Sequence, residues 1–261
     1  MMPGSPDLIL AADIDVLPLG RRGAAHSDAM RAPLASLRIP PWPTSPQMSV
    51  AVLATFLSAK GFRVRAFDNI LHLPWSRQRF LEALDSRPLA VGISTSMLCL
   101  PDSVRTITDW ARERCPEARV VLGGVSAESD PEVRDMADVV VFGAGERSLE
   151  LLLRALKTDA PLDDVPNLMF RKHGQWVRTR SQANVPIEAI PPTDWSLLDS
   201  RASLCYSIES SRGCPHSCAF CCYRDRMDES FRSAPVIVEE MRRDQERFGA
   251  RVLRFVDNNL T

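Results

Sequence analysis

The feature that most constrains the fold is a regular alternation of short apolar runs with longer amphipathic segments over residues 1–160. The apolar runs, rich in β-branched residues and of strand length, lie at 7–12, 62–68, 89–95, 119–124 and 138–143. The segments with helical spacing of apolar residues lie at 47–61, 76–85, 101–115 and 145–157. This alternation predicts an α/β fold: a parallel sheet of the Rossmann or flavodoxin-like type, with helices on both faces.

Local signals place the ends of these helices. Gly61 has the position of a residue that follows a helix C-terminus in the left-handed conformation. Ser76 is a typical N-cap for the second helix, and Pro101 suits the first turn of the third. We therefore expect the second helix to begin at Ser76.

The chain changes character after the last of these helices. Residues 167–179 predict a hairpin that turns at His173 and Gly174, and the Pro-rich, aperiodic residues 184–199 predict a linker. A new βαβ unit follows, with a strand at 205–211, a helix from Ser233 to Gly249 and a returning strand. The expected domains are 1–160, a hairpin and linker over 161–200, and 201–261, where one βαβ unit alone implies an incomplete second domain.

Small and polar residues stand at the ends of three predicted parallel strands. Ligands of open parallel sheets bind outside the carboxyl ends of the strands, where glycines let them approach the backbone closely. For any one of these residues a tight turn is the favoured interpretation, but three similar strand ends shift the balance toward a binding edge. The candidate ligand-binding residues are Ser94, Ser96, Gly123, Gly124, Gly143 and Gly145.

Composition narrows the class of protein. A formal net charge of −1 gives no reason to propose nucleic acid or an anionic membrane as partner. No apolar run approaches the roughly 20 residues that span a bilayer. Seven cysteines are an odd number, in a chain too large to need disulfide staples. This favours a reducing, cytoplasmic setting in which clustered thiols bind metal.

Four of the seven cysteines lie within twelve residues. Cys214, Cys218 and Cys221 have the spacing C-x3-C-x2-C, and Cys222 follows directly. A disulfide knot is the weakest interpretation, and a structural zinc site would need a fourth ligand, such as His216 or Cys222. Three thiolates without a fourth suit a four-iron cluster with one open iron, which can bind a substrate or cofactor directly.

Residues 211–221, SRGCPHSCAFC, resemble the signature loop of the radical S-adenosylmethionine superfamily, with Phe220 at the aromatic position. The resemblance implies that the three spaced cysteines bind a [4Fe-4S] cluster and that Phe220 lies near the adenine of S-adenosylmethionine. In that family the open iron chelates S-adenosylmethionine, and one electron cleaves it to a 5′-deoxyadenosyl radical. The segment 255–261 resembles the one that helps hold the methionine end, which makes Asp257 and Asn258 further cofactor-binding candidates.

The N-terminal segments resemble the cobalamin-binding domain of the cobalamin-dependent branch of this superfamily. The resemblance rests on the order of the segments 48–68, 90–97, 120–133 and 137–156, and it implies cobalamin as a further cofactor. Many such domains carry an Asp-x-His-x-x-Gly motif whose His ligates cobalt. The nearest match here, Asp15 to Gly20, has Leu17 at the His position, which implies cobalamin binding without a protein His ligand.

The resemblance implies an enzyme that transfers a methyl group to an unactivated carbon of a small, natural-product-like substrate. Cyclisation or rearrangement is also known in the group. An electron donor such as a flavodoxin or ferredoxin would supply the reducing electron. Two rivals remain open: a radical enzyme whose N-terminal domain binds no corrin, and a zinc-stabilised, non-enzymatic interaction module. With one βαβ unit of the barrel, we expect these 261 residues alone not to turn over substrate.

Overall fold

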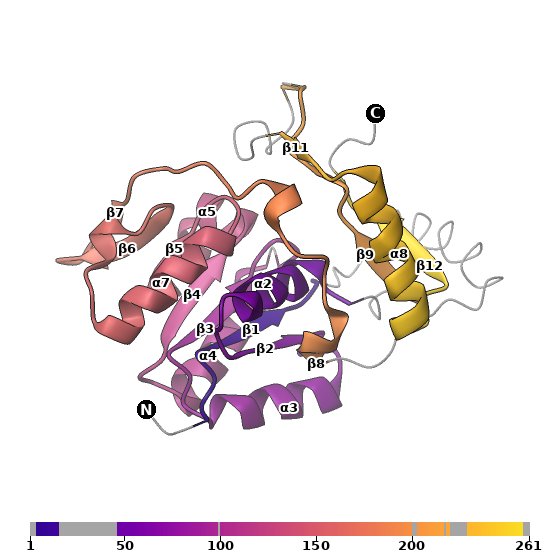
Figure 1. Cartoon of the computed structure of the whole chain (residues 1–261). Helices are drawn as coiled ribbons and strands as arrows, with labels where there is room; N and C mark the ends of the chain where they lie inside the picture. The colour runs from indigo at the N-terminus through magenta and orange to yellow at the C-terminus, as the bar shows by residue number, and fades with distance from the viewer. Residues whose placement is uncertain are drawn as a thin grey trace.

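The computed structural model describes residues 4–15, 46–98, 100–199, 203–216, 218–219 and 229–257. Its body is an eight-stranded sheet in the order β7-β6-β5-β4-β3-β1-β2-β8 (Figure 1). The strands of this sheet are β1 (Leu8–Ala12), β2 (Val64–Asp68), β3 (Ala90–Ser94), β4 (Arg119–Gly123), β5 (Val139–Val141), β6 (Leu168–Lys172), β7 (Gln175–Arg178) and β8 (Leu198–Asp199).

The five central strands are all parallel and follow the order 2-1-3-4-5. This order is that of the flavodoxin-like doubly wound sheet, whose topological switch point lies between β1 and β3. The predicted fold class is therefore confirmed, and the switch point marks the edge of the sheet where a ligand is expected.

Helices cover both faces of the sheet (Figure 1). One face carries α2 and α7, and the other carries α3 to α6. The bounds of these helices are α2 (Met48–Ala59), α3 (Pro74–Leu84), α4 (Pro101–Arg114), α5 (Val125–Ser129), α6 (Pro131–Arg134) and α7 (Glu146–Thr158). A short 3-10 turn, η1 (Leu162–Asp164), follows α7.

Strand β1 shows how the sequence builds these layers. Leu8 and Leu10 pack toward α2 and α7, whereas Ile9 and Ala11 pack toward α3 and α4. Successive side chains of a strand point to opposite faces, so a strand covered on both faces must be apolar at every position. All five residues of β1 are at most 2% exposed.

The start of α3 differs from the prediction. The helix begins at Pro74, two residues before the expected N-cap Ser76. Proline fits the first turn because its missing N–H has no partner there in any helix. The Ser76 hydroxyl instead donates to the backbone oxygen of Asp68 at 2.6 Å, which ties the helix to the end of β2.

The hairpin predicted at His173 and Gly174 forms β6 and β7. Both turn residues have positive φ, 51° and 80°, as a tight hairpin turn requires. Strand β6 pairs antiparallel with β5, so the hairpin extends the edge of the N-terminal sheet. At the opposite edge, β8 adds a short parallel strand beside β2.

The last part of the chain forms a separate βαβ unit. Strand β9 (Cys205–Ile208) pairs in parallel with β12 (Val252–Phe255), and α8 (Ala234–Phe248) connects them. The helix starts after Ser233 and ends at Gly249, whose φ is 69°, as predicted. A small ladder of β10 (Ser211–Arg212) and β11 (Ser230–Phe231) lies beside them. We call residues 203–257 the C-terminal unit.

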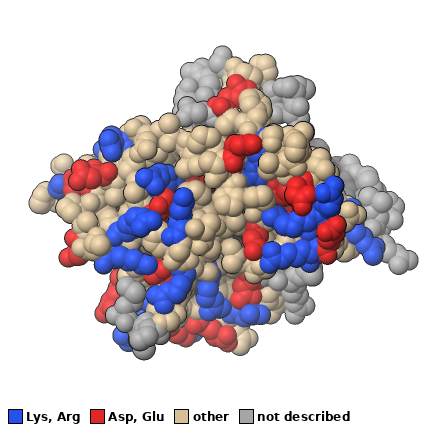
Figure 2. All heavy atoms as spheres, viewed as in Figure 1, with Lys and Arg blue, Asp and Glu red and all other residues tan. Residues whose placement is uncertain are grey.

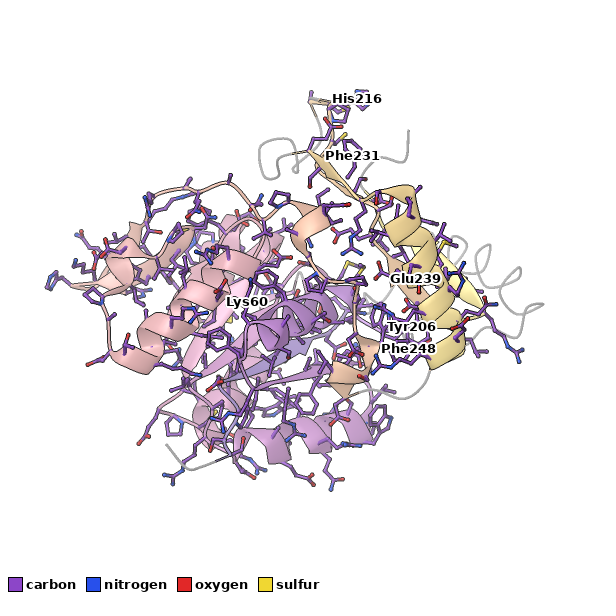
Figure 3. The ribbon with its side chains drawn as sticks, in the orientation of Figure 1. Lys60, Tyr206, His216, Phe231, Glu239 and Phe248 are labelled. Carbon is purple, nitrogen blue, oxygen red and sulfur yellow. The ribbon has the colours of Figure 1, made fainter. Side chains whose placement is uncertain are left out.

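The linker joins the two units through a shared core. It contains two 3-10 turns, η2 (Ile187–Ala189) and η3 (Trp195–Leu197). The Trp195 ring lies 5.2 Å from that of Tyr206, which in turn lies 5.8 Å from Phe248 (Figure 3). The Trp195 indole N–H donates to Asp244, and the backbone N–H of Asp194 donates to the Thr55 hydroxyl on α2. The linker is thus held between α2 and α8.

Two surface properties bear on partners. On the face shown in Figure 2, basic and acidic side chains are intermingled over both units. Within the described ranges, none of the helices has the length and apolarity that a membrane crossing requires.

Candidate functional site

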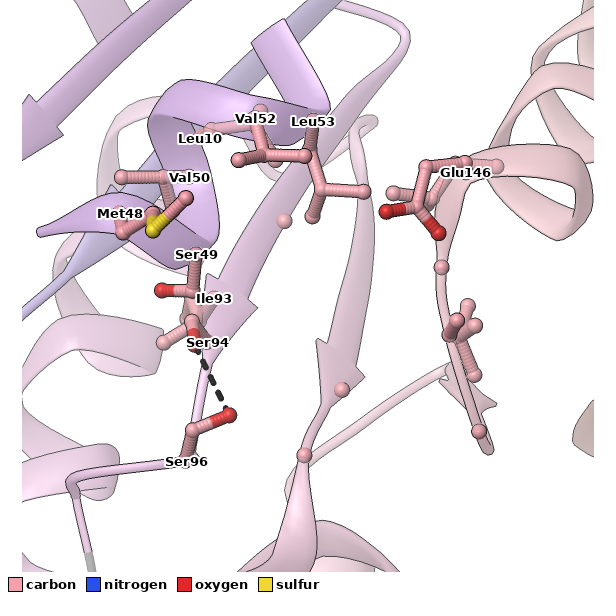
Figure 4. Close-up of a pocket in the computed structure, with 18 of the residues that line it drawn as sticks. Leu10, Met48, Ser49, Val50, Val52, Leu53, Ile93, Ser94, Ser96 and Glu146 are labelled. Carbon is pink, nitrogen blue, oxygen red and sulfur yellow. Dashed lines mark hydrogen bonds between the residues drawn. The ribbon is translucent and has the colours of Figure 1, made fainter. Parts of the chain in front are cut away.

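A cavity of about 360 Å³ lies between the carboxyl ends of the central strands and the C-terminal unit. Its wall includes all six residues that the sequence singled out at the strand ends: Ser94, Ser96, Gly123, Gly124, Gly143 and Gly145. The structure therefore brings these six residues together. Figure 4 shows Ser94 and Ser96 on one side of the cavity and Glu146 on the other.

Most of the remaining wall is apolar. The first turns of α2 contribute Met48, Val50, Val52 and Leu53, and strands β1, β3, β4 and β5 contribute Leu10, Ile93, Leu122 and Val141. The sequence indicated the strand ends but gave no sign that α2 would form a wall. Its buried side belongs to the core, and only the packed structure shows that its first turns also face the cavity.

Two backbone features shape the strand ends. Gly124 has a φ of 109°, and a Cβ atom there would lie only 2.7 Å from the backbone nitrogen of Ser96. Between these loops, Thr95 donates its backbone N–H to the Gly123 oxygen at 2.7 Å and accepts the N–H of Ala127 at 3.0 Å. Gly124 is thus required by the contact between two loops, which is the tight-turn interpretation, while it also lines the cavity.

The charged residues in this wall form one buried cluster that spans the two units. Arg212, from β10, makes an ion pair with Glu146 at the start of α7, with 2.7 Å between Nη1 and Oε1. The same guanidinium donates from Nε and Nη2 to the two carboxylate oxygens of Glu209, at 2.8 and 2.9 Å. The side chains of Arg212 and Glu146 are only 8% and 4% exposed.

The carboxylates of Glu146 and Glu209 therefore surround one guanidinium in a largely buried environment. Burial by itself lowers the pKa of the Arg212 guanidinium, but Glu146 and Glu209 outweigh it and raise the pKa above its ordinary value. Arg212 thus remains charged, and the cluster carries a formal charge of −1 at the wall of an otherwise apolar cavity. In the sequence Glu146 follows a glycine turn, where an acidic residue fits either a ligand contact or the favourable start of a helix.

The cysteine loop begins directly after this cluster. The pairs Ser211–Phe231 and Arg212–Ser230 close its base. Cys214 is partly buried and Cys218 is exposed, and both carry free thiols. Figure 3 shows His216 at the tip of this segment, which projects beyond the sheet. Phe220 and Cys221 lie outside the described residues, as do Cys222 and Asn258, so the three-cysteine set remains a prediction.

Asp257, which the sequence assigned to cofactor binding, lies at the base of the same loop. Its carboxylate accepts the backbone N–H groups of Ser210 and Ser211 at 2.7 and 2.6 Å, and the Ser210 hydroxyl at 2.8 Å. Hydrogen bonds from two backbone amides and a hydroxyl fix a carboxylate firmly. In this structure Asp257 therefore holds the loop base against the end of β12.

The residues present fit the cofactors that the sequence resemblance implied. An apolar wall, small residues at the strand ends and a buried charge cluster suit a large ring with apolar faces and polar edges. Thiols on a short loop suit a soft metal centre. By contrast with the loop thiols, Cys115 is buried directly after the last residue of α4. Burial raises the pKa of its thiol to about 11 and keeps it protonated.

The fold and the cavity define the class of the N-terminal part. Residues 43–153 match the protein-family model described as "B12 binding domain". The segment that contains α2 and strands β2 to β5 is therefore similar to B12-binding domains.

Similar proteins extend this identification beyond the domain. The chain is 30% identical over 214 residues to hopanoid C-3 methylase of Methylococcus capsulatus, covering 76% of this chain and 40% of that protein. It is 29% identical over 147 residues to anaerobic magnesium-protoporphyrin IX monomethyl ester cyclase of a Synechocystis species, covering 51% of this chain and 28% of that protein.

Among solved structures, the chain resembles the radical S-adenosylmethionine methyltransferase TsrM from Kitasatospora setae, solved with cobalamin and a [4Fe-4S] cluster bound. The TM-score is 0.67 at 19% identity, over 97% of this chain and 48% of that one. The chain thus spans less than half the length of these three proteins. Together the matches confirm the resemblance to the cobalamin-binding radical S-adenosylmethionine family.

Proposed function

We propose that this chain is the cobalamin-binding domain and cluster-bearing start of a radical S-adenosylmethionine enzyme, and that the enzyme is a methyltransferase acting on a small molecule. The observation that carries the proposal is the position of the cavity. It lies at the carboxyl edge of a B12-binding-type sheet, and its far wall is formed by Arg212, two residues before the first predicted cluster cysteine.

The chain's own residues have three tasks under this proposal. Cys214, Cys218 and Cys221 would hold the [4Fe-4S] cluster, and the apolar wall would hold one face of the corrin. Asp257 and Arg212 fix the loop base relative to the cavity through the contacts described above. When bound, the cluster with S-adenosylmethionine supplies radical chemistry and the corrin supplies methyl transfer.

The apolar wall has a further consequence for the reaction. Since Leu53, Val52 and Val141 line the cavity, a bound ligand would displace water from it. Exclusion of water strengthens electrostatic interactions inside a site and protects reactive species. The proposed substrate is a small, natural-product-like molecule, and a flavodoxin or ferredoxin is the proposed source of the electron.

Metal analysis after anaerobic purification and reconstitution with iron and sulfide tests the cluster. We expect four-iron stoichiometry and cluster absorption in the wild-type chain, and loss of both in Cys214→Ala, Cys218→Ala and Cys221→Ala. Cys222→Ala is the matched control, since it removes a thiol from the same loop and should retain the cluster. Zinc without iron or sulfide in the wild-type protein would instead support the non-enzymatic module.

Cobalamin binding is tested separately, by titration of the same protein with cobalamin and by its visible absorption after gel filtration. Retention of cobalamin supports the proposal. A chain that assembles the cluster but retains no cobalamin would support the alternative of a radical enzyme whose N-terminal domain serves as scaffold.

A further inference from the structure

One carboxylate oxygen in the cavity wall has no hydrogen-bond partner. Glu146 is 3% exposed, and among the described residues its Oε2 is buried without a donor, although its Oε1 pairs with Arg212. Figure 4 shows the carboxylate pointing into the cavity, toward Leu53. A buried carboxylate oxygen without a donor is costly, because it has lost its water and gained nothing in return.

Among the described residues, no group donates a hydrogen bond to this oxygen. Arg212 directs Nε and Nη2 to Glu209, and its Nη1 forms the ion pair with the other oxygen of Glu146 but has no hydrogen-bond partner of its own there. Within the part of the chain that the structure describes, the charged side chains in the cavity wall are Glu146, Glu209 and Arg212. A ligand that fills the cavity can therefore supply the donor that Oε2 lacks.

The surroundings define the chemistry of that donor. An anionic group is excluded, because the cluster already carries a formal charge of −1 and repels it. The wall beside Glu146 is apolar, with Leu53 and Leu149, so a strongly hydrated cation would lose more hydration than one oxygen restores. A neutral N–H donor on the edge of an apolar ring meets both conditions. The rim of a corrin carries such donors in the form of primary amides.

We propose that Oε2 of Glu146 accepts an N–H from a peripheral amide of the bound corrin, and that Arg212, paired with Oε1, holds the carboxylate in position from the C-terminal unit. The inference rests on the proposed function, since it assumes that the cavity binds cobalamin. It assigns Glu146 a ligand-binding role and Arg212 a positioning role. It also gives the wall one point of polar recognition on an otherwise apolar surface.

The test compares cyanocobalamin with its monocarboxylic derivatives, in each of which one peripheral amide is replaced by an acid. Binding to the full-length chain is measured by absorbance titration. We expect at least one derivative to bind wild type about tenfold or more weakly, because a carboxylate would replace the donor next to Glu146. Glu146→Gln, whose amide can donate to that acid, should narrow the difference for the same derivative.

The matched control is Glu150→Gln, one turn further along α7. Glu150 is also buried and ion-paired, with Arg147 and Arg154, but it does not line the cavity. The Glu150→Gln variant should show the same difference in affinity between cyanocobalamin and each derivative as wild type does. If Glu146→Gln fails to fold, Glu146→Asp replaces it: the shorter side chain withdraws the carboxylate from the derivative's acid and should also narrow the difference.

The two proposals fail in different ways. Affinities of wild type for cyanocobalamin and all derivatives that agree within about twofold would overturn the role of Glu146 and leave the proposed function intact. Absence of any cobalamin binding by folded wild-type protein would overturn the proposed function and this inference with it. Equal loss of discrimination in Glu150→Gln would also overturn the inference, since the effect would then not belong to Glu146.

Discussion

Strands β1 and β12 both belong to parallel βαβ units, yet their environments differ sharply. Strand β1 pairs with β2 and β3 and is covered by helices on both faces, so none of its residues exceeds 2% exposure. Among the described residues β12 pairs only with β9, and Phe255 at its end is 38% exposed. Strand β1 is apolar throughout and β12 at three of its four positions, yet even the apolar residues of β12 are only partly buried or exposed, so the number of covered edges and faces decides their burial.

The helices repeat the contrast. Helix α2 lies between the sheet and the linker and buries seven of its twelve residues. Helix α8 is longer, but its two buried residues are the acids Glu240 and Asp244, and its Val238 is 50% exposed. The N-terminal sheet is thus stabilised by apolar burial on both faces, whereas α8 is attached to the linker largely through charged and polar contacts.

The largest expected effect tests apolar burial in the two regions. Phe80 on α3 is fully buried and packs edge-on against Phe67, with ring centroids 5.7 Å apart. Phe80→Ala should lower the free energy of unfolding by about 3–5 kcal/mol, because it leaves a cavity in a dense core. Phe255→Ala should cost less than about 1 kcal/mol. Urea denaturation followed by circular dichroism measures both, and similar costs would contradict the contrast.

The next effect concerns the polar attachment of α8. Glu240 is buried, forms an ion pair with the buried Arg232, and accepts the backbone N–H of Thr193 at 2.9 Å. Glu240→Ala should cost about 3 kcal/mol in the free energy of unfolding, since it leaves the Arg232 charge buried and unpaired.

Glu239→Ala is the control for this prediction. Glu239 is adjacent on the same helix and pairs with Arg242, but both side chains are more than half exposed (Figure 3). Its loss should change stability by less than about 0.5 kcal/mol. Equal unfolding midpoints for the two variants would show that α8 does not depend on the buried pair.

The smallest expected effect is a pH dependence of the free energy of unfolding, which comes from Asp68 at the end of β2. Burial, with a smaller contribution from Asp13, raises the pKa of the Asp68 carboxyl from 3.8 to about 6. Between these values the folded state binds more protons than the unfolded state, so this group adds stability as the pH falls from 7 toward 4. The change should be on the order of 2 kcal/mol.

Asp68→Asn isolates this contribution, because the amide is uncharged at every pH. Relative to wild type, the variant should be most stable at pH 7 and lose that advantage as the pH falls to 4. Thermal or urea unfolding across this range measures the difference. A constant difference between the two proteins would show that Asp68 does not titrate as its burial requires.

Much of the N-terminal fold could be read from sequence because its signals are local. The doubly covered strands are continuous apolar runs, and the helix ends carry Gly61 and Pro101 in positions that steric rules favour. The error at Ser76 arose where two signals competed. Pro74 could start the helix earlier, and only the packed structure shows that the Ser76 hydroxyl bonds to Asp68.

The candidate site also contains some residues that the sequence revealed and others that only the structure shows. The strand ends could be recognised because glycine and serine at the carboxyl edge of a parallel sheet have a known use, and the cysteine spacing indicated a metal centre. The pairing of Glu146 with Arg212 could not be found in this way. These residues are 66 positions apart in sequence and belong to different units, so no periodicity or spacing connects them.

The sequence by itself determined the layered α/β fold, the edge of the sheet where the cavity lies, and the spacing of the cysteines, because each follows from short-range pattern and backbone sterics. The tertiary structure alone decided that α2 would form a cavity wall, that Asp257 would hold the loop base, and that one oxygen of Glu146 would receive no hydrogen bond from the residues that the structure describes. Those outcomes depend on how two units pack together, and packing is set by contacts between residues that the sequence keeps far apart.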